Sequence, residues 1–260
     1  MPTLPLDIFL YIIDLLAAGD DEDVKSLQIL SLACKYMVPL CRKHIFWSLN
    51  LYSNLVSERF SKLLLKNPDI ARYVTRLSYR VFNPISDHEL NILDMLKEHA
   101  SIQWIHLWSL ELDCKWNNLA ESVRSSLVSL IQLPTVTLLN IDSFKGFPAT
   151  ALSGCSNLVD LQFMSLDLAP PEVNQVISRS KIPTPQYIKT DTFSLAAILI
   201  SASLHEGDPI VDFSRLQKAE FNVKSRDDLG QVNELIKVTT WLEYLYLGGG
   251  WLTSSLIPQN

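Results

Sequence analysis

Histidine and cysteine are the residue types that most often do chemistry near neutral pH, and the chain has few of either. Its five histidines are spread from His44 to His205, and none has further histidine, cysteine or carboxylate residues at the spacing of a metal site. The four cysteines form no Cys-x-x-Cys pair, so we expect reduced thiols buried as small apolar groups. The sequence therefore predicts no catalytic residue, no metal site and no cofactor.

The motifs of common enzyme classes are missing as well. The chain has no Gly-x-Ser-x-Gly, no phosphate-binding P-loop, no Gly-x-Gly-x-x-Gly and no His-Glu-x-x-His. We therefore expect a protein that is not an enzyme; an enzyme with an unrecognised site is the alternative. The net charge of −6 argues against a nucleic-acid partner, because phosphate binding needs basic surface.

The elements that would position functional residues come from a chain with enough apolar material for a large core. The chain has 260 residues, of which 48% are hydrophobic. Its apolar runs do not predict a membrane span or a signal peptide. The run 4–19 contains two aspartates and has no basic start, and the run 193–204 is shorter than the ~20 residues that a spanning helix needs.

The first fifty residues predict three short helices. Apolar residues recur at helical spacing from Leu6 to Leu16, and similar patterns cover 24–34 and 36–47. The first pattern is apolar around most of its circumference, whereas a surface helix has one apolar stripe about 100° wide. Because three short helices make only a marginal core, we expect a partner or a neighbouring domain to cover the remaining apolar surface.

Several landmarks of this segment occur in a familiar order. They are Leu4-Pro5, Asp7-Ile8, Ile12 to Leu16, Leu30 to Tyr36 with its Cys-Lys-Tyr triplet, and Ile45-Phe46-Trp47. Together they resemble the F-box over roughly residues 3–50. The family more often has glutamate where Asp7 stands, and the acidic run 20–23 is an insertion. Such insertions are familiar in F-box-like proteins of mushroom-forming fungi, which the whole chain resembles. A generic three-helix capping element is the alternative.

A second pattern, Leu-x-x-Leu-x-Leu with other apolar residues allowed, recurs through the rest of the chain. Its copies start at residues 74, 102, 136, 158, 216 and 242. With a less regular copy near 187–192, the mean spacing is about 28 residues, within the range of leucine-rich repeats. Helix-like runs lie between the copies, at 87–99, 119–130, 171–180, 195–204 and 228–238. This alternation predicts a right-handed solenoid of βα units.

This region is similar to the irregular leucine-rich repeats of F-box proteins, and the asparagine of regular repeats is mostly absent. The predicted fold class is therefore α/β, with a small all-α F-box helical domain followed by a leucine-rich-repeat-like βα solenoid. The predicted domains are an F-box at 1–52, a linker helix at 53–72 and the solenoid at 73–260. No polar cap follows the last copy, which is compatible with a truncated C-terminus. A doubly wound α/β domain is the alternative.

The resemblance implies a partner for each part. An F-box binds a Skp1-like linker protein and through it a cullin, so the chain would be the substrate-recognition adaptor of an SCF-type ubiquitin ligase, in the cytoplasm, the nucleus or both. A protein-interaction scaffold outside any ligase is the alternative. By match to the F-box landmarks, the residues that face the Skp1-like protein are Leu4, Pro5, Ile8, Ile12, Leu32, Cys34 and Lys35.

The predicted substrate surface is the concave face of the sheet, and the sequence does not identify the protein substrate. In each copy the second and third apolar positions point inward, so the residues beside them point outward. Arginines of the first strand would then lie beside tryptophans of the next, a composition typical of binding hot spots. A loop or the linker helix covering these indoles is the alternative. The predicted residues are Arg76, Arg80, Trp104, His106, Trp108, Tyr244 and Tyr246.

Overall fold

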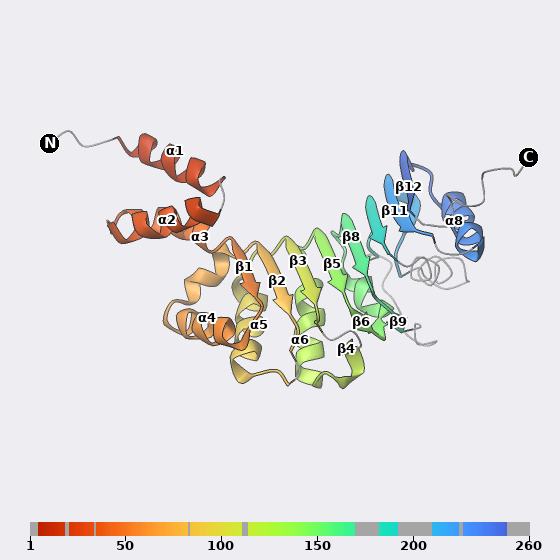
Figure 1. Ribbon diagram of the computed structural model, residues 1–260, viewed down its shortest axis with the longest axis horizontal. Coiled ribbons are helices and arrows are strands. Elements are labelled where there is room, and N and C mark those ends of the chain that lie inside the picture. Colours follow the sequence, from red (N-terminus) through yellow and green to blue (C-terminus); the bar gives the residue numbers. More distant parts are fainter. Residues whose placement is uncertain are drawn as a thin grey trace, which may run out of the picture.

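The protein has mixed α/β architecture with a parallel sheet, seen in a computed structural model (Figure 1). The row of strands curves, and helices lie along the outer side of the curve. The structure describes residues 5–18, 21–33, 35–82, 84–110, 114–169, 182–191, 210–223 and 226–248. The predicted helices at 171–180 and 195–204 and the tail 251–260 lie outside these residues.

Eight described strands form one sheet in which every neighbouring pair is parallel and the strand order follows the chain order. A doubly wound sheet instead reverses its strand order at a switch point, so this order does not fit the doubly wound alternative. The strands are β1 (Ser48–Leu51), β2 (Arg76–Arg80), β3 (Trp104–Trp108), β5 (Leu138–Asp142), β8 (Asp160–Met164), β10 (Tyr187–Thr190), β11 (Lys218–Asn222) and β12 (Tyr244–Gly248).

Helices and short segments connect these strands. The helices are α4 (Asn54–Lys66), α5 (Asp87–His99), α6 (Glu121–Ile131) and α8 (Arg226–Val238). Short 3-10 turns are η1 (Pro68–Tyr73), η2 (Trp116–Asn118), η3 (Ala149–Gly154) and η5 (Phe213–Arg215). Two further strand pairs lie beside the main sheet, β4 (Cys114–Lys115) with β6 (Phe144–Lys145) and β7 (Phe147–Pro148) with β9 (Leu168–Ala169).

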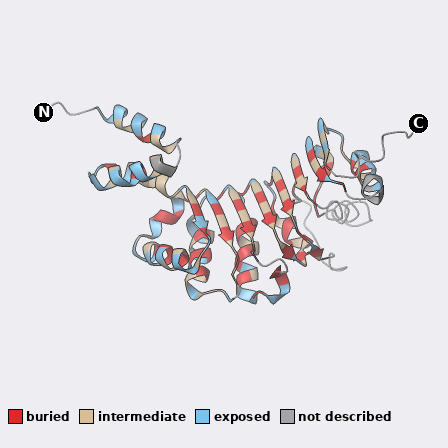
Figure 2. Ribbon diagram, in the orientation of Figure 1, coloured by how far each residue is buried: buried red, intermediate tan, exposed pale blue. Residues whose placement is uncertain are grey.

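A strand lies at each of the seven predicted copies of the apolar pattern, and α5 has the bounds predicted for it. Alternation along the strands explains this agreement. In β2, Leu77 and Tyr79 are buried in one core with Ile92 and Leu96 of α5, while the residues between them are not buried (Figure 2). Each buried leucine-sized side chain contributes roughly 1.5–3 kcal/mol, so reversing the faces of even one strand would be costly.

A helix, α4, lies within the region predicted as a linker helix, and it packs into the main core. Strand β1 directly precedes α4 in the chain and pairs with β2, so α4 lies in the connection between two neighbouring strands. The side chains of Phe60 and Leu64 on α4 belong to the main core, together with Leu51 of β1. Residues 54–66 are therefore part of the sheet-and-helix layer, which begins at Ser48.

Helix α5 begins at a capping box. The carboxylate of Glu89 accepts hydrogen bonds from the backbone N–H of Ser86 (2.9 Å) and from its hydroxyl (3.1 Å). The other oxygen of Glu89 accepts from the hydroxyl of Ser57 on α4 (3.5 Å). Glu89 and Ser57 are both fully buried, so this carboxylate joins two helices inside the core.

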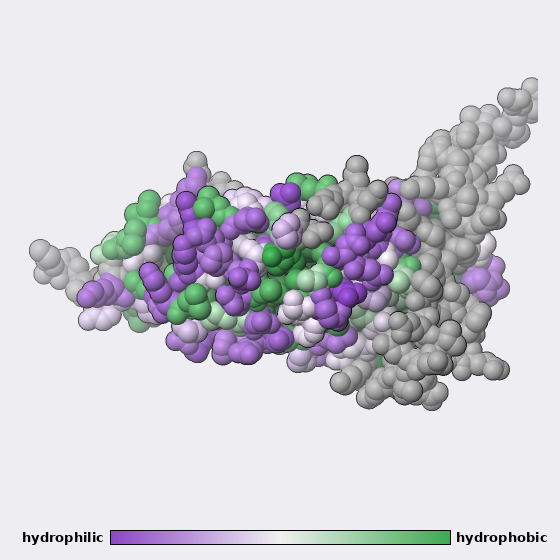
Figure 3. Space-filling view, turned by 90° about the horizontal axis from the view of Figure 1, so that it is seen from below, coloured by the Kyte–Doolittle hydropathy of each residue, from purple (hydrophilic) through white to green (hydrophobic). Residues whose placement is uncertain are grey.

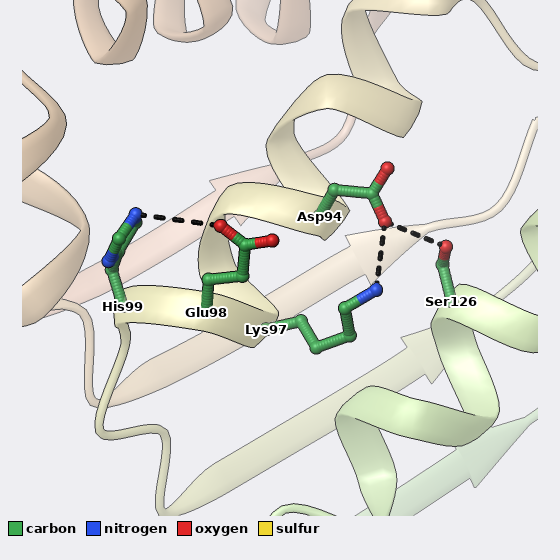
Figure 4. Close-up of polar contacts among 5 residues, drawn as sticks. All are labelled: Asp94, Lys97, Glu98, His99 and Ser126. Carbon is green, nitrogen blue, oxygen red and sulfur yellow. Dashed lines mark hydrogen bonds and ion pairs between the residues drawn. The ribbon is translucent and has the colours of Figure 1, made fainter.

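Polar contacts also join α5 to α6. Asp94 Oδ1 accepts from the hydroxyl of Ser126 on α6 (3.1 Å) and pairs with Lys97 Nζ (3.3 Å), while His99 Nε2 lies 3.8 Å from Glu98 (Figure 4). Seen from below, the molecule carries widespread hydrophilic side chains with smaller hydrophobic groups between them (Figure 3). The hydrogen bond between Ser126 and Asp94 therefore links α6 to α5 on the outer side of the sheet, while the two ion pairs lie within α5.

The N-terminal helices α1 (Leu6–Ala17), α2 (Asp21–Ala33) and α3 (Met37–Ile45) have a separate, small core. Its buried members among the described residues are Ile13, Leu27, Met37 and Cys41. At its edge, the carboxylate of Asp14 lies 3.2 Å from His44 Nε2 and 3.7 Å from Lys43 Nζ. Burial and the neighbouring Lys43 lower the pKa of His44 more than Asp14 raises it.

No helix in the part of the chain that the structure describes is both long and apolar enough to cross a bilayer.

Candidate functional site

The side of the sheet away from α4, α5 and α6 presents a row of side chains from every strand. We call this side the open face. None of its residues is fully buried. Because neighbouring strands pair in register, its residues form three rows that run across the sheet. The first row, from β2 to β12, consists of Arg76, Trp104, Leu138, Asp160, Tyr187, Lys218 and Tyr244. The second row, over the same strands, consists of Ser78, His106, Asn140, Gln162, Lys189, Glu220 and Tyr246. The third row, from β2 to β8, consists of Arg80, Trp108, Asp142 and Met164.

Arg76 lies between two indole rings at the end of the open face formed by β1, β2 and β3, which we call the first end. Its guanidinium carbon is 4.8 Å from the ring centre of Trp104 and 5.1 Å from that of Trp47. Trp104 is directly opposite Arg76 in the register of β2 and β3, and Trp47 immediately precedes β1. Contacts of this kind between a guanidinium and an aromatic ring are worth about 0.5–1 kcal/mol at exposed sites. Together they favour an orientation in which the guanidinium contacts both rings.

A second arginine and tryptophan repeat this arrangement one row away. Arg80 has its guanidinium carbon 5.8 Å from the ring centre of Trp108 and 4.8 Å from that of Phe82. One of its N–H groups donates to the carbonyl oxygen of Tyr52 (3.3 Å). The indole N–H of Trp108 donates to the hydroxyl of Ser78 (3.3 Å). The indoles of Trp104 and Trp108 are both half-buried on the open face.

His106 occupies the position between the two tryptophans of β3. Its ring stacks on Trp108 with 6.3 Å between ring centres and lies 5.8 Å from the ring centre of Trp104. Burial lowers the pKa of His106, and Asp142 on the next strand opposes that shift only in part. The imidazole is therefore neutral at pH 7. It contributes a flat aromatic surface that continues the two indoles.

The centre of the open face is polar. The carboxylate of Asp160 accepts a hydrogen bond from the side-chain amide of Gln162 (3.1 Å). Burial raises the pKa of Asp160. On the adjacent strand, the side-chain oxygen of Asn140 is buried and has no hydrogen-bond partner among the described residues. This polar centre separates the aromatic groups at the two ends.

The far end of the open face combines tyrosines with charged residues. Lys218 Nζ lies 5.0 Å from the ring centre of Tyr187 and 5.1 Å from that of Tyr244. It also forms a 2.9 Å ion pair with Glu220, whose other oxygen lies 3.5 Å from Lys189. The hydrogen bond from Lys218 lowers the pKa of Glu220, while burial and Glu220 raise that of Tyr187. A groove of about 320 Å³ lies here, lined by residues at the C-terminal ends of β8, β10, β11 and β12.

The predicted residues of the concave face thus fall into two groups. Five of them, on β2 and β3, lie together, as the strand register required. Tyr244 and Tyr246 are exposed on the same face but lie five strands from β3, about 24 Å away at 4.8 Å per strand. The prediction did not include Trp47 at one end or Tyr187, Lys218 and Glu220 at the other. The outward positions of Tyr187, Lys218 and Glu220 in the strand pattern were the available signal, whereas Trp47 stands at the end of a predicted helix.

The N-terminal helices carry the other predicted surface. Among the described residues of that prediction, Ile8 is 45% exposed, Ile12 is 38% exposed and Leu32 is 87% exposed. Pro5 and Lys35 are also exposed, whereas Leu4 and Cys34 lie outside the described residues. Further apolar side chains of α1 and α2 accompany them, namely Leu6, Tyr11, Leu15 and Ile29. The small core of these helices therefore leaves much apolar surface in water (Figure 2).

Metal-ligating residue types and similarity to known proteins also bear on the function of the chain. Across the described ranges, no group of three or more histidine, cysteine or carboxylate side chains is placed to hold a metal ion. No family model matches the chain, and neither a curated protein nor a solved structure comes out as a significant match. The described structure thus has two separate candidate surfaces, the exposed apolar side chains of α1 and α2 and the open face.

Proposed function

We propose that the chain is an F-box adaptor with leucine-rich-repeat-like units, the substrate-recognition subunit of an SCF-type ubiquitin ligase. The observation that carries this proposal is the uncovered apolar surface of α1 and α2 around Ile8, Ile12 and Leu32. A free helical domain with so small a core has reason to bury this surface against a partner. The partner we propose is a Skp1-like linker protein, which would connect the chain to a cullin.

The sheet supports the second half of the proposal. Its strands follow one another in chain order, recur about every 28 residues and share one core with the helices on their outer side. These are the features of a stack of repeated βα units, in which each unit contacts its neighbours. The concave surface of such a stack is its usual binding surface, and here it is the open face. We propose that the open face binds a protein substrate.

In this function the chain catalyses no reaction and needs no cofactor or metal. It would hold a substrate on the open face while α1 and α2 are bound to the ligase. Holding both on one chain raises the effective concentration of the substrate near the ubiquitin-charged partner. A ligase subunit of this kind would work in the cytoplasm, the nucleus or both.

Purification of the tagged full-length chain from lysate of its own source, with mass spectrometry of what it captures, tests this function. We expect a Skp1-like protein and a cullin. Replacing Ile8 and Leu32 by serine should reduce this capture at least tenfold, because each side chain loses roughly 1.5–3 kcal/mol of burial. Leu65→Ser is the matched control, since Leu65 is equally apolar and 65% exposed but lies on α4.

Three outcomes would count against parts of the proposal. Capture of a Skp1-like protein without a cullin would favour the scaffold outside a ligase. Equal loss with the Leu65→Ser control would show that the apolar surface of α1 and α2 is not the specific contact. No capture of a Skp1-like protein by the folded parent chain would contradict the F-box assignment itself.

A further inference from the structure

The two basic groups on the open face differ in how their charge is balanced. At the far end, Lys218 and Lys189 both contact Glu220, so an anion arriving there would compete with an existing ion pair. At the first end, no described carboxylate lies within ion-pair distance of Arg76 or Arg80. Among the described residues, the arginines of β2 are therefore cations of the open face without an ion-pair partner, in a chain whose net charge is −6.

The geometry around Arg76 prepares it for an anion. Trp47 and Trp104 lie on either side of its guanidinium, which leaves the N–H groups at the rim of the guanidinium plane for a ligand. A planar guanidinium binds a carboxylate through two parallel hydrogen bonds, and such pairs are stronger than neutral ones. Because the rings already restrict the arginine, it loses less conformational freedom when it binds.

The chemistry of the surroundings favours a peptide over other anions. Indoles and the neutral imidazole of His106 form an aromatic floor beside the arginines, on which apolar side chains of a protein segment can pack. Polyanions such as nucleic acids are disfavoured by the overall negative charge and by Asp142 and Asp160 on neighbouring strands. A segment with a few carboxylates among apolar residues fits both features.

We propose that this end of the open face binds an extended protein segment through its aspartate or glutamate side chains, with Arg76 as the principal anchor and Arg80 as the second. The inference rests on the proposed function of the open face as a substrate surface, and it names the class of segment bound. Arg76 and Arg80 are four residues apart in one strand, about 13 Å at 3.3 Å per residue. A segment extended along β2 would match them with acidic residues four positions apart.

Fluorescence polarisation with synthetic peptides and the purified full-length chain tests the proposal. The probe is a labelled twelve-residue peptide with leucine and tyrosine residues and two glutamates four positions apart. Matched peptides carry glutamine at both positions, glutamates at adjacent positions, or phosphoserine at both positions. We expect the probe to bind at least tenfold more tightly than the glutamine peptide, and more tightly than the peptide with adjacent glutamates.

Protein variants then assign the binding to the arginine. Arg76→Gln should weaken binding of the probe by 10- to 100-fold and reduce its salt dependence, and Arg76→Lys should restore only part of the affinity. Lys218→Gln is the matched control because it removes a positive charge that lies between two rings on the same face but is already paired with Glu220. Its affinity for the probe should stay within twofold of the parent.

Four results would overturn the proposal: equal binding of the glutamate and glutamine peptides, no effect of Arg76→Gln in a folded variant, no binding of any peptide, or phosphoserine binding more than tenfold tighter than glutamate. The last would assign the site to phosphorylated segments instead. Capture of the Skp1-like protein is measured on the same preparations. If the parent chain captures the Skp1-like protein but does not bind the probe peptide, only this inference is contradicted. If the parent chain does not capture the Skp1-like protein, the proposed function is contradicted.

Discussion

Glu89 is the residue whose replacement tests most directly how the outer layer of helices is held on the sheet. Its carboxylate is fully buried, accepts two hydrogen bonds from Ser86 at the start of α5 and receives a third from Ser57 on α4. The hydroxyl of Tyr79 on β2 is also buried, has no hydrogen-bond partner among the described residues, and has its pKa raised by burial and by Glu89. The carboxylate thus connects the cap of α5 to α4 by hydrogen bonds, and its charge acts on the buried hydroxyl of Tyr79.

Replacing Glu89 by alanine should lower the free energy of unfolding by roughly 2–4 kcal/mol. Hydrogen bonds to a charged group contribute about 1.5–3 kcal/mol each, and the N-terminal cap of a helix about 1 kcal/mol. Relief from burying a charge offsets part of their sum. Glu89→Gln keeps the size of the side chain and one acceptor oxygen, so it should cost about 1 kcal/mol.

Equilibrium unfolding in guanidinium, followed by both circular dichroism and tryptophan fluorescence, measures these changes. In a chain of this size, a loss of about 3 kcal/mol corresponds to a fall of roughly 6–12 °C in the melting temperature. Glu98→Ala is the matched control, because Glu98 is on the same helix with its side chain 65% exposed and should change stability by less than about 0.5 kcal/mol. If Glu89→Ala unfolds within about 0.5 kcal/mol of the parent, the capping box does not hold α5.

Two further predictions follow from the titration of buried groups. Because the pKa of His106 is lower in the folded than in the unfolded chain, the unfolded chain binds more protons as the pH falls below about 6.5, and stability should decrease. His106→Gln should reduce that decrease between about pH 7.5 and pH 5.5 in denaturant titrations, and an unchanged pH dependence would contradict the assignment. Burial raises the pKa of Cys155 to about 12, so a thiol reagent at about pH 8 should label it at least a hundredfold more slowly in the folded than in the denatured chain. Mass spectrometry locates the label, and rapid labelling of Cys155 in the native chain would contradict its burial.

Much of the sheet could be predicted from the sequence because its information is local. In Val74-x-x-Leu77-x-Tyr79 the alternate residues Leu77 and Tyr79 must face the same side of the strand, and both are fully buried, as is Val74 just before the strand. The same reasoning placed Arg76 opposite Trp104, since equal positions in consecutive copies become neighbours in a parallel pair. The neighbouring positions of the arginines and tryptophans on β2 and β3 could therefore be predicted from the sequence.

Other features depend on contacts between segments that no local pattern contains. Strand β1 has only four residues, and its Leu49 and Leu51 gain a partner only when β2 folds beside it. The sequence pattern predicted no strand between the helix at 36–47 and the linker helix that follows. At the far end, Lys218 lies beside Ala219, a small residue at a position where the pattern has leucine, and its aromatic neighbours come from β10 and β12. Weak local signal and long-range pairing together explain why this group was not predicted.

The charge balance along the open face decides where an acidic ligand gains most. At the far end an incoming carboxylate must compete with the ion pair between Lys218 and Glu220, so attraction to the lysine is offset by repulsion from the glutamate. At the first end Arg76 contacts two neutral rings, and an incoming carboxylate meets no described anion at ion-pair distance from the guanidinium. Both ends therefore place a cation between aromatic rings, but an acidic segment should prefer the arginine end. Charge balance, which depends on three-dimensional neighbours, thus distinguishes two sites that look alike in residue type.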